Sequence, residues 1–240
     1  RDLVIFGGLA AGAALLVSFI LSHLAQNFKL GADDHLGNKP QRLHHHKACR
    51  LGGVGIIAGL GVYTLLSLPT GSSGAAFSEP FPVWVVFVGL PVFVLGFIED
   101  CRGSLSARQR LAAAFVSALV AAFLLKAVLP IPGNSAYWVG FLCWSFTCFC
   151  VTGATHAFNI IDGLNGLASG IAVIVLAGLG WMAHGLGDVL LMQLSVGTIV
   201  AILGFMMVNF PFGHIFLGDG GAYLIGFLVA ECSVLLLVRH

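Results

Sequence analysis

Apolar residues fill eight long stretches of this chain, and the short segments between them carry nearly all of its charged residues. The stretches cover residues 3–24, 51–68, 82–98, 111–129, 136–152, 164–183, 189–208 and 222–238. A helix needs about 20 apolar residues to cross the hydrocarbon core of a bilayer. We therefore predict an all-α fold, a polytopic helical membrane protein with about eight transmembrane helices that form one integral membrane domain over residues 1–240.

The composition supports insertion into a lipid bilayer and excludes several other classes. Charged residues make up 9% of the 240 residues and hydrophobic residues 58%, whereas a soluble domain carries roughly 25% charged residues. A soluble globule, a disordered chain and a nucleic-acid binder with a basic face are therefore excluded, and the net charge of +1 predicts no nucleic-acid partner. Small residues favour close helix contacts in lipid, so we expect the glycine-rich stretch 51–68 to be a short span packed tightly against its neighbours.

The distribution of Lys and Arg predicts which loops face the cytoplasm, since cytoplasmic loops carry the excess of positive charge. The loops on one side hold Lys29, Lys39, Arg42, Lys47, Arg50, Arg102, Arg108 and Arg110. The other side holds only Arg1, Lys126 and Arg239. We therefore predict that the first set of loops is cytoplasmic.

Four carboxylates stand at or near the predicted cytoplasmic ends of spans, namely Glu99, Asp100, Asp162 and Asp219. Isolated charges beside hydrocarbon are costly to hold, so basic partners or a cation would offset that cost. The adjacent pair 99–100 also fits a plain interfacial anchor, and Asp219 fits a cap at the positive end of a helix. The sharper interpretation is a Mg²⁺ site, because this ion prefers carboxylate oxygens and shares its coordination shell with water and substrate phosphates.

The first predicted cytoplasmic segment, residues 33–53, is basic and ends in two glycines. Lys39, Arg42 and Arg50 are suited to binding phosphate, because they supply positive charge where glycine lets the backbone approach a ligand. Contact with anionic lipid headgroups is an open alternative. The three consecutive histidines 44–46 raise the question of zinc, but consecutive side chains rarely converge on one ion and no second cluster completes a tetrahedral site.

The third and fourth cytoplasmic segments add amides to the carboxylates. On a helix, Asn159 and Asp162 lie three residues apart and share a face that Asn165 continues. The alternative is a turn, since Asp-Gly and Asn-Gly pairs usually mark turns. In the fourth segment Asn209 precedes Asp219. All four segments lie on one predicted membrane face, so we expect three carboxylates, those of Asp100, Asp162 and Asp219, to converge within reach of one ion and its waters.

Three motifs resemble those of the polyprenyl-phosphate N-acetylhexosamine-1-phosphate transferases, glycosyltransferase family 4. They are Gly-Phe-Ile-Glu-Asp (96–100), Asn-Ile-Ile-Asp-Gly-Leu-Asn-Gly-Leu-Ala (159–168) and Phe-Leu-Gly-Asp-Gly-Gly (216–221). The resemblance covers nearly the whole chain in order and spacing, and Lys-Pro-Gln-Arg-Leu-His (39–44) is similar to the undecaprenyl-phosphate GlcNAc-1-phosphate transferase branch.

The resemblance implies a reaction. A sugar-1-phosphate would move from a UDP-sugar to undecaprenyl phosphate, giving undecaprenyl-diphospho-sugar and UMP, with Mg²⁺ or in its place Mn²⁺. The site would lie on the cytoplasmic face of a bacterial inner membrane, and the pathway would be cell-envelope polysaccharide synthesis.

The resemblance also implies roles for individual residues. Glu99 and Asp100 stand at the family's acidic pair, where Asp100 would orient or deprotonate the lipid phosphate or help to bind the ion, and Asp219 matches the metal ligand. The residues matched to the nucleotide and phosphate contacts are Asn159, Asp162, Asn209, Arg110 and Phe216, the last as a stacking partner for uracil. A phosphate monoester has its second pKa near 6, so strong general-base catalysis by Asp100 is not required.

The chain departs from the family pattern in places, and these departures leave alternatives open. Glu99 and Asn165 replace aspartates, and the family's last cytoplasmic loop, with its His-rich motif, would follow residue 238. We therefore interpret residues 1–240 as a partial sequence that lacks the family's C-terminal loop and last helices, and expect this chain to be inactive or impaired. A non-catalytic homologue and, less favoured, a cation-coupled transporter are the alternatives. The sugar and the oligomeric state, a homodimer included, stay open.

Overall fold

The computed structural model describes residues 2–28, 49–67, 81–130 and 137–240, and these residues are helical apart from turns and one isolated β-bridge. The helices are α1 (Asp2–Phe28), α2 (Gly52–Leu66), α3 (Phe81–Arg102), α4 (Ala107–Leu124), α5 (Tyr137–Ile161), α6 (Leu167–Gly185), α7 (Val189–Asn209) and α8 (Gly218–Arg239). Seven of these helices are long and apolar enough to cross a membrane, and α2, with 15 residues, is shorter. The predicted all-α, multi-pass membrane architecture is confirmed.

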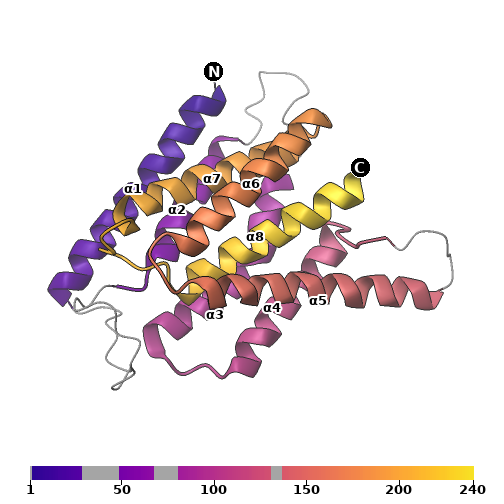
Figure 1. Ribbon diagram of the computed structural model, residues 1–240, viewed down its shortest axis with the longest axis horizontal. Helices are drawn as coiled ribbons and strands as arrows, with labels where there is room; N and C mark the ends of the chain where they lie inside the picture. Colours follow the sequence, from indigo (N-terminus) through magenta and orange to yellow (C-terminus); the bar gives the residue numbers. More distant parts are fainter. Residues whose placement is uncertain (1, 29–48, 68–80, 131–136) are drawn as a thin grey trace.

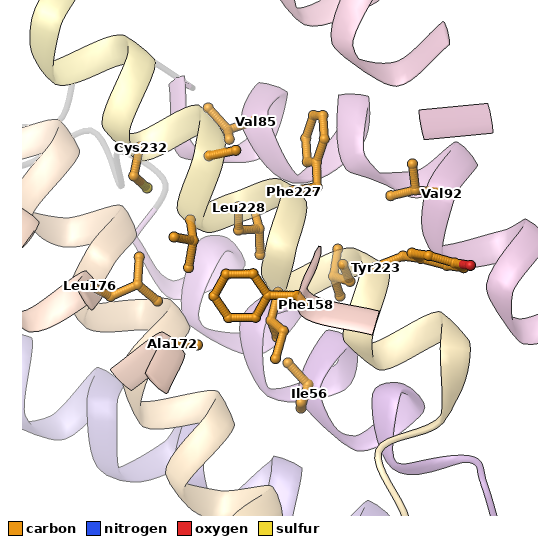
Figure 2. Packing of buried hydrophobic residues seen from close by; sticks show 14 of the residues in the cluster. Ile56, Val85, Val92, Phe158, Ala172, Leu176, Tyr223, Phe227, Leu228 and Cys232 are labelled. Atoms are coloured by element: carbon orange, nitrogen blue, oxygen red, sulfur yellow. The ribbon is translucent and has the colours of Figure 1, made fainter. Parts of the chain in front are cut away.

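Helix α8 runs through the middle of the bundle, with α6 on one side and α5 on the other (Figure 1). Its side chains are buried along most of its length. Figure 2 shows Ile56, Val85, Phe158 and Leu176, from four other helices, gathered around α8. Because the other helices surround α8, a residue in its first turn meets side chains from several neighbours at once.

The outer surface of the bundle is strongly apolar. Large side chains such as Phe123, Phe141, Phe149 and Trp181 point outward, each more than 70% exposed. A soluble protein rarely exposes contiguous apolar surface of this extent. The exposed faces are therefore suited to contact lipid chains.

Two pairs of glycines bring three helices together at one end of the bundle. A Cβ atom on Gly53 of α2 would lie 2.5 Å from the backbone nitrogen of Gly221 in α8. A Cβ atom on Gly96 of α3 would lie 2.6 Å from the Cα of Gly220. Only glycine permits these backbone contacts, which confirms the close packing expected of the glycine-rich helix α2. They hold the start of α2 and the last turns of α3 against the first turn of α8.

Several predicted helix ends differ from the structure in ways that affect the polar residues. Helix α4 begins at Ala107 instead of 111, because Ser106 and Gln109 form a capping box that satisfies free N–H groups. Helix α5 continues to Ile161, nine residues beyond its predicted end, and α6 begins at Leu167 instead of 164. Of the two alternatives for residues 159, 162 and 165, the shared helical face is wrong and the turn is observed, since residues 162–166 form turns between these helices.

Candidate functional site

The first and fourth polar segments pair along their backbones. The N–H of Phe216 donates to the carbonyl oxygen of Cys49 (2.7 Å), and the N–H of Gly52 donates to the carbonyl oxygen of Phe216 (2.9 Å). The isolated parallel bridge between Cys49 and Ile215 lies in the same stretch. This pairing places Arg50 beside the first turn of α8.

Asp100, in the last turn of α3, binds the N-terminus of α8. Its Oδ1 accepts a hydrogen bond from the N–H of Asp219 (2.8 Å), and its Oδ2 accepts one from the N–H of Gly220 (2.9 Å). The first N–H groups of a helix have no partner within the helix, and no side chain of α8 supplies one at its N-cap. Asp100, whose side chain is 2% exposed, therefore caps α8 from another helix.

Asp219 lies between two arginines from different segments. Its Oδ1 lies 3.1 Å from Nη2 of Arg50, and its Oδ2 lies 3.0 Å from Nη1 of Arg110. Arg50 Nε also lies 3.7 Å from Oδ1 of Asp100, and Arg110 Nη1 lies 3.7 Å from Oε1 of Glu99. Three carboxylates thus face two guanidinium groups within this cluster.

Glu99 has a second contact, which orders the turn between α3 and α4. Its Oε2 accepts a hydrogen bond from the N–H of Leu105 (2.7 Å). Since Ser106 then caps α4, the glutamate helps to direct the start of the helix that carries Arg110. The Glu99 side chain thus reaches both the turn and Arg110.

The third segment meets the fourth at the same end of the bundle. The Nδ2 of Asn165 donates to the carbonyl oxygen of Pro211 (3.2 Å). Asp162 follows the last residue of α5, and burial raises its pKa to about 7, although Arg50 opposes that shift while Asp219 adds to it. Asp162 is therefore within electrostatic range of Arg50 and Asp219 in the cluster.

Two other residues proposed to bind substrate have structural contacts. The Nδ2 of buried Asn209 donates to the carbonyl oxygen of Ile215 (2.7 Å), which closes the turn that leads into α8. Phe216 is half-buried, and its backbone pairs with the first segment. Lys39 and Arg42 lie outside the described residues.

The donor chemistry of the cluster fits a magnesium ion bound in part by substrate. No group of three or more His, Cys, Asp or Glu side chains gathers closely enough to hold an ion within the described parts of the chain. The convergence of Asp162 with Asp100 and Asp219 on one ion is therefore not seen. Each oxygen of Asp100 and Asp219 takes one close hydrogen bond and keeps a lone pair. Mg²⁺ is usually held by one or two carboxylates together with phosphates and water, so these two aspartates are suited to it.

A cavity of about 320 Å³ opens beside Arg110, and part of its lining was not predicted. It includes Asn159, which was expected at the site, and also Arg108, His156 and Tyr223. The His156 and Tyr223 rings meet edge to face, with centroids 5.1 Å apart. His156 precedes Asn159 by three residues and Tyr223 follows Asp219 by four, so helical spacing alone puts each on the face of a predicted site residue.

A bundle of long apolar helices with a half-buried, charged cluster at one end defines a multi-pass membrane protein with a polar site at the ends of its spans. The chain belongs to glycosyl transferase family 4, whose profile matches residues 82–237. The family predicted from the sequence motifs is confirmed.

Three relatives illustrate the similarity. A protein of Bacillus subtilis (strain 168), named probable undecaprenyl-phosphate N-acetylglucosaminyl 1-phosphate transferase, is 31% identical over 92% of this chain and 59% of its own length. A phospho-N-acetylmuramoyl-pentapeptide-transferase of Synechococcus sp. (strain JA-3-3Ab) is 30% identical over 96% of this chain and 68% of its own length. A decaprenyl-phosphate N-acetylglucosaminephosphotransferase of Mycolicibacterium smegmatis is 32% identical over 80% of this chain and 50% of its own. The chain thus spans between half and about two thirds of these relatives.

Proposed function

We propose that this chain is the membrane core of a transferase that moves an N-acetylhexosamine-1-phosphate from a UDP-sugar to undecaprenyl phosphate. The names of the relatives describe an undecaprenyl-phosphate N-acetylglucosaminyl 1-phosphate transferase and a phospho-N-acetylmuramoyl-pentapeptide-transferase. The observation that supports the proposal in this chain is the Asp100–Asp219–Arg50–Arg110 cluster at the ends of the spans. We further propose that this end faces the cytoplasm of a bacterial inner membrane, as the distribution of Lys and Arg predicts.

The cluster suits a reaction between two anions. An oxygen of the lipid phosphate attacks the phosphorus that bears the sugar, a new P–O bond forms, and the bond to the UMP oxygen breaks with its electron pair. Arg50 and Arg110 neutralise phosphate charge as the two reactants approach. Asn159, which borders the cavity beside Arg110, is placed to contact the nucleotide or sugar, and Phe216 is proposed to stack on uracil.

Asp100 acts in this proposal as a positioning residue. Both of its oxygens accept backbone N–H groups of α8, so it fixes Asp219 relative to the arginines. The lipid phosphate is largely ionised at neutral pH and needs no base. Asp219, with Asp100 beside it, would hold Mg²⁺ or Mn²⁺, which when bound supplies further positive charge to the diphosphate.

An apolar groove gives the lipid chain a path to this site. The groove, of about 480 Å³, lies between α4 and α5 and is lined by Leu111, Phe115 and Phe149 among others. It borders the polar cavity, because Arg108, Leu111 and His156 line both hollows. A polyprenyl chain in the groove would therefore present its phosphate at the polar end.

The direct test is a transferase assay of the purified full-length gene product that contains this chain. The substrates are undecaprenyl phosphate and radiolabelled UDP-N-acetylglucosamine, with Mg²⁺, with Mn²⁺ or with a chelator. The expected product is a labelled lipid diphosphate with one UMP released per lipid, formed only with a divalent ion and lost on Asp219→Asn. Binding of both substrates without turnover would favour a non-catalytic homologue, and binding of neither would refute the proposal.

A further inference from the structure

The junction between the polar cavity and the apolar groove contains two polar groups that the proposed reaction does not yet use. Arg108 and His156 line both hollows, one from the first turn of α4 and the other from α5. Arg110, on the same helix as Arg108, points its guanidinium at Asp219 and Glu99 instead. The two arginines of this turn therefore differ in what they face.

Among the residues that the structure describes, Arg108 is a cation without a paired carboxylate. Its side chain is exposed, and no carboxylate within the described ranges forms an ion pair with it, whereas Arg50 and Arg110 are both engaged. It stands where an apolar channel meets a polar space. An anion carried at the end of an apolar chain would place its charge at this point.

His156 adds a second unused group at the same junction. Its Nε2 is buried and has no hydrogen-bond partner among the described residues, and the backbone of Arg110 lies beside the ring. A buried polar atom without a partner carries a free-energy cost. The ring borders both hollows, which Arg108 also lines.

We propose that Arg108, with His156 beside it, recognises the terminal phosphate of the polyprenyl acceptor and so makes the site select a lipid phosphate over the corresponding alcohol. This inference rests on the proposed function. Arg108 would donate N–H groups to the phosphate oxygens, a charge-assisted contact that a hydroxyl group does not match. The groove would bind the apolar chain of either lipid.

The test measures binding, so that it does not depend on turnover. The chain is purified in detergent, and its affinities for farnesyl phosphate and for farnesol are compared by microscale thermophoresis. We expect Arg108→Gln to weaken farnesyl phosphate binding about tenfold, or about 1.4 kcal/mol, and to leave farnesol binding within about twofold. Arg108→Lys keeps the charge and should retain most of the affinity, and His156→Ala should weaken phosphate binding about threefold.

Arg102→Gln is the matched control, because Arg102 is also exposed near the α3–α4 turn and lines neither hollow. Unchanged farnesyl phosphate binding in Arg108→Gln, or an equal loss in Arg102→Gln, would overturn the inference while leaving the transferase proposal intact. The inference would also be overturned if dioleoylphosphatidylglycerol competed for the site as strongly as farnesyl phosphate does, since Arg108 would then bind the headgroups of ordinary membrane lipids. If the unmodified chain binds farnesyl phosphate no better than farnesol, both the inference and the proposed acceptor fail.

Discussion

Replacing Asp100 by Asn separates the structural role of this carboxylate from the chemistry of its neighbour. The two oxygens of Asp100 accept the N–H groups of Asp219 and Gly220 at 2.8 and 2.9 Å. An asparagine at this position keeps one acceptor oxygen but turns its NH₂ group toward the other N–H. One charge-assisted hydrogen bond is then lost, and one buried N–H is left without an acceptor.

The expected loss follows from these two contacts. A hydrogen bond to a charged group contributes about 1.5–3 kcal/mol, and a buried donor without a partner costs about 1–3 kcal/mol. Since the two effects overlap, we expect Asp100→Asn to lower the free energy of unfolding by about 3 kcal/mol. For a chain of this size, about 1 kcal/mol corresponds to about 2–4 °C in Tm, so Tm should fall by roughly 6–12 °C.

The assay is thermal unfolding in detergent, followed by the fluorescence of the four tryptophans. Asp219→Asn is the control. It leaves Arg50 and Arg110 with partly exposed side chains, 36% and 26%, and with Asp100 and Glu99 still nearby. We expect it to change stability by less than about 1 kcal/mol while abolishing transfer. A Tm within about 2 °C of the unmodified protein for Asp100→Asn, or equal losses in both variants, would refute the capping role.

Three further predictions concern other parts of the bundle. Gly53→Ala should lower the free energy of unfolding by about 1–3 kcal/mol, because its Cβ would lie 2.5 Å from the nitrogen of Gly221. Gly61→Ala in the same helix, where a Cβ would have no atom within 4 Å, should raise the free energy of unfolding by about 0.5–1 kcal/mol, and similar melting temperatures for the two variants would contradict the close contact at Gly53. Burial raises the pKa of Asp162 from 3.8 to about 7, so between these pH values the folded protein holds a proton that the unfolded chain releases, and the stability of the ligand-free protein should fall as pH rises from about 4 to 7. Urea titrations at several pH values should show a weaker fall for Asp162→Asn, and the same dependence of stability on pH in this variant would count against the raised pKa of Asp162. Asp188 caps α7 through the N–H of Leu191 and pairs with Arg239 at the opposite end of the bundle; burial alone would raise its pKa, but these contacts outweigh it and lower the pKa below 3.8. Asp188→Ala should therefore lower the free energy of unfolding by about 1–2 kcal/mol at pH 7, and this loss should shrink as pH falls through the lowered pKa.

The helices and the polar segments could be predicted from local pattern because each depends on nearby residues. The apolar stretches between charged loops mark the helices, and Ser106 followed by Gln109 is a capping signal readable in the sequence alone. The errors were also local. Residues 162–166 form turns where a helical face was expected, since the Asp-Gly and Asn-Gly pairs favour turns over a continued helix.

The partners of the polar residues could not be read from the sequence, because they join positions far apart along the chain. Asp100 was expected near an ion, and nothing in the sequence indicated that it also caps the N-terminus of α8 through the N–H of Asp219, 119 residues away. Arg108 and Arg110 look equivalent in the sequence as two basic residues in one turn. In the structure Arg110 faces the carboxylate of Asp219, whereas Arg108 lines the junction of the two hollows. His156 and Tyr223 carry no motif of their own and enter the cavity lining only through the packing of α5 against α8.

The sequence by itself determined the class of protein, since composition and apolar length decide whether helices enter a bilayer, and its motifs determined the family. The tertiary structure decided which charges meet. Glycine contacts at Gly53 and Gly96 bring three helix backbones together, and only at that separation can Asp100 reach the N–H groups of α8 and Arg50 reach Asp219. Hydrogen bonds and ion pairs act over a few ångströms, so the packing of the helices, rather than the order of residues, sets the identity of each partner.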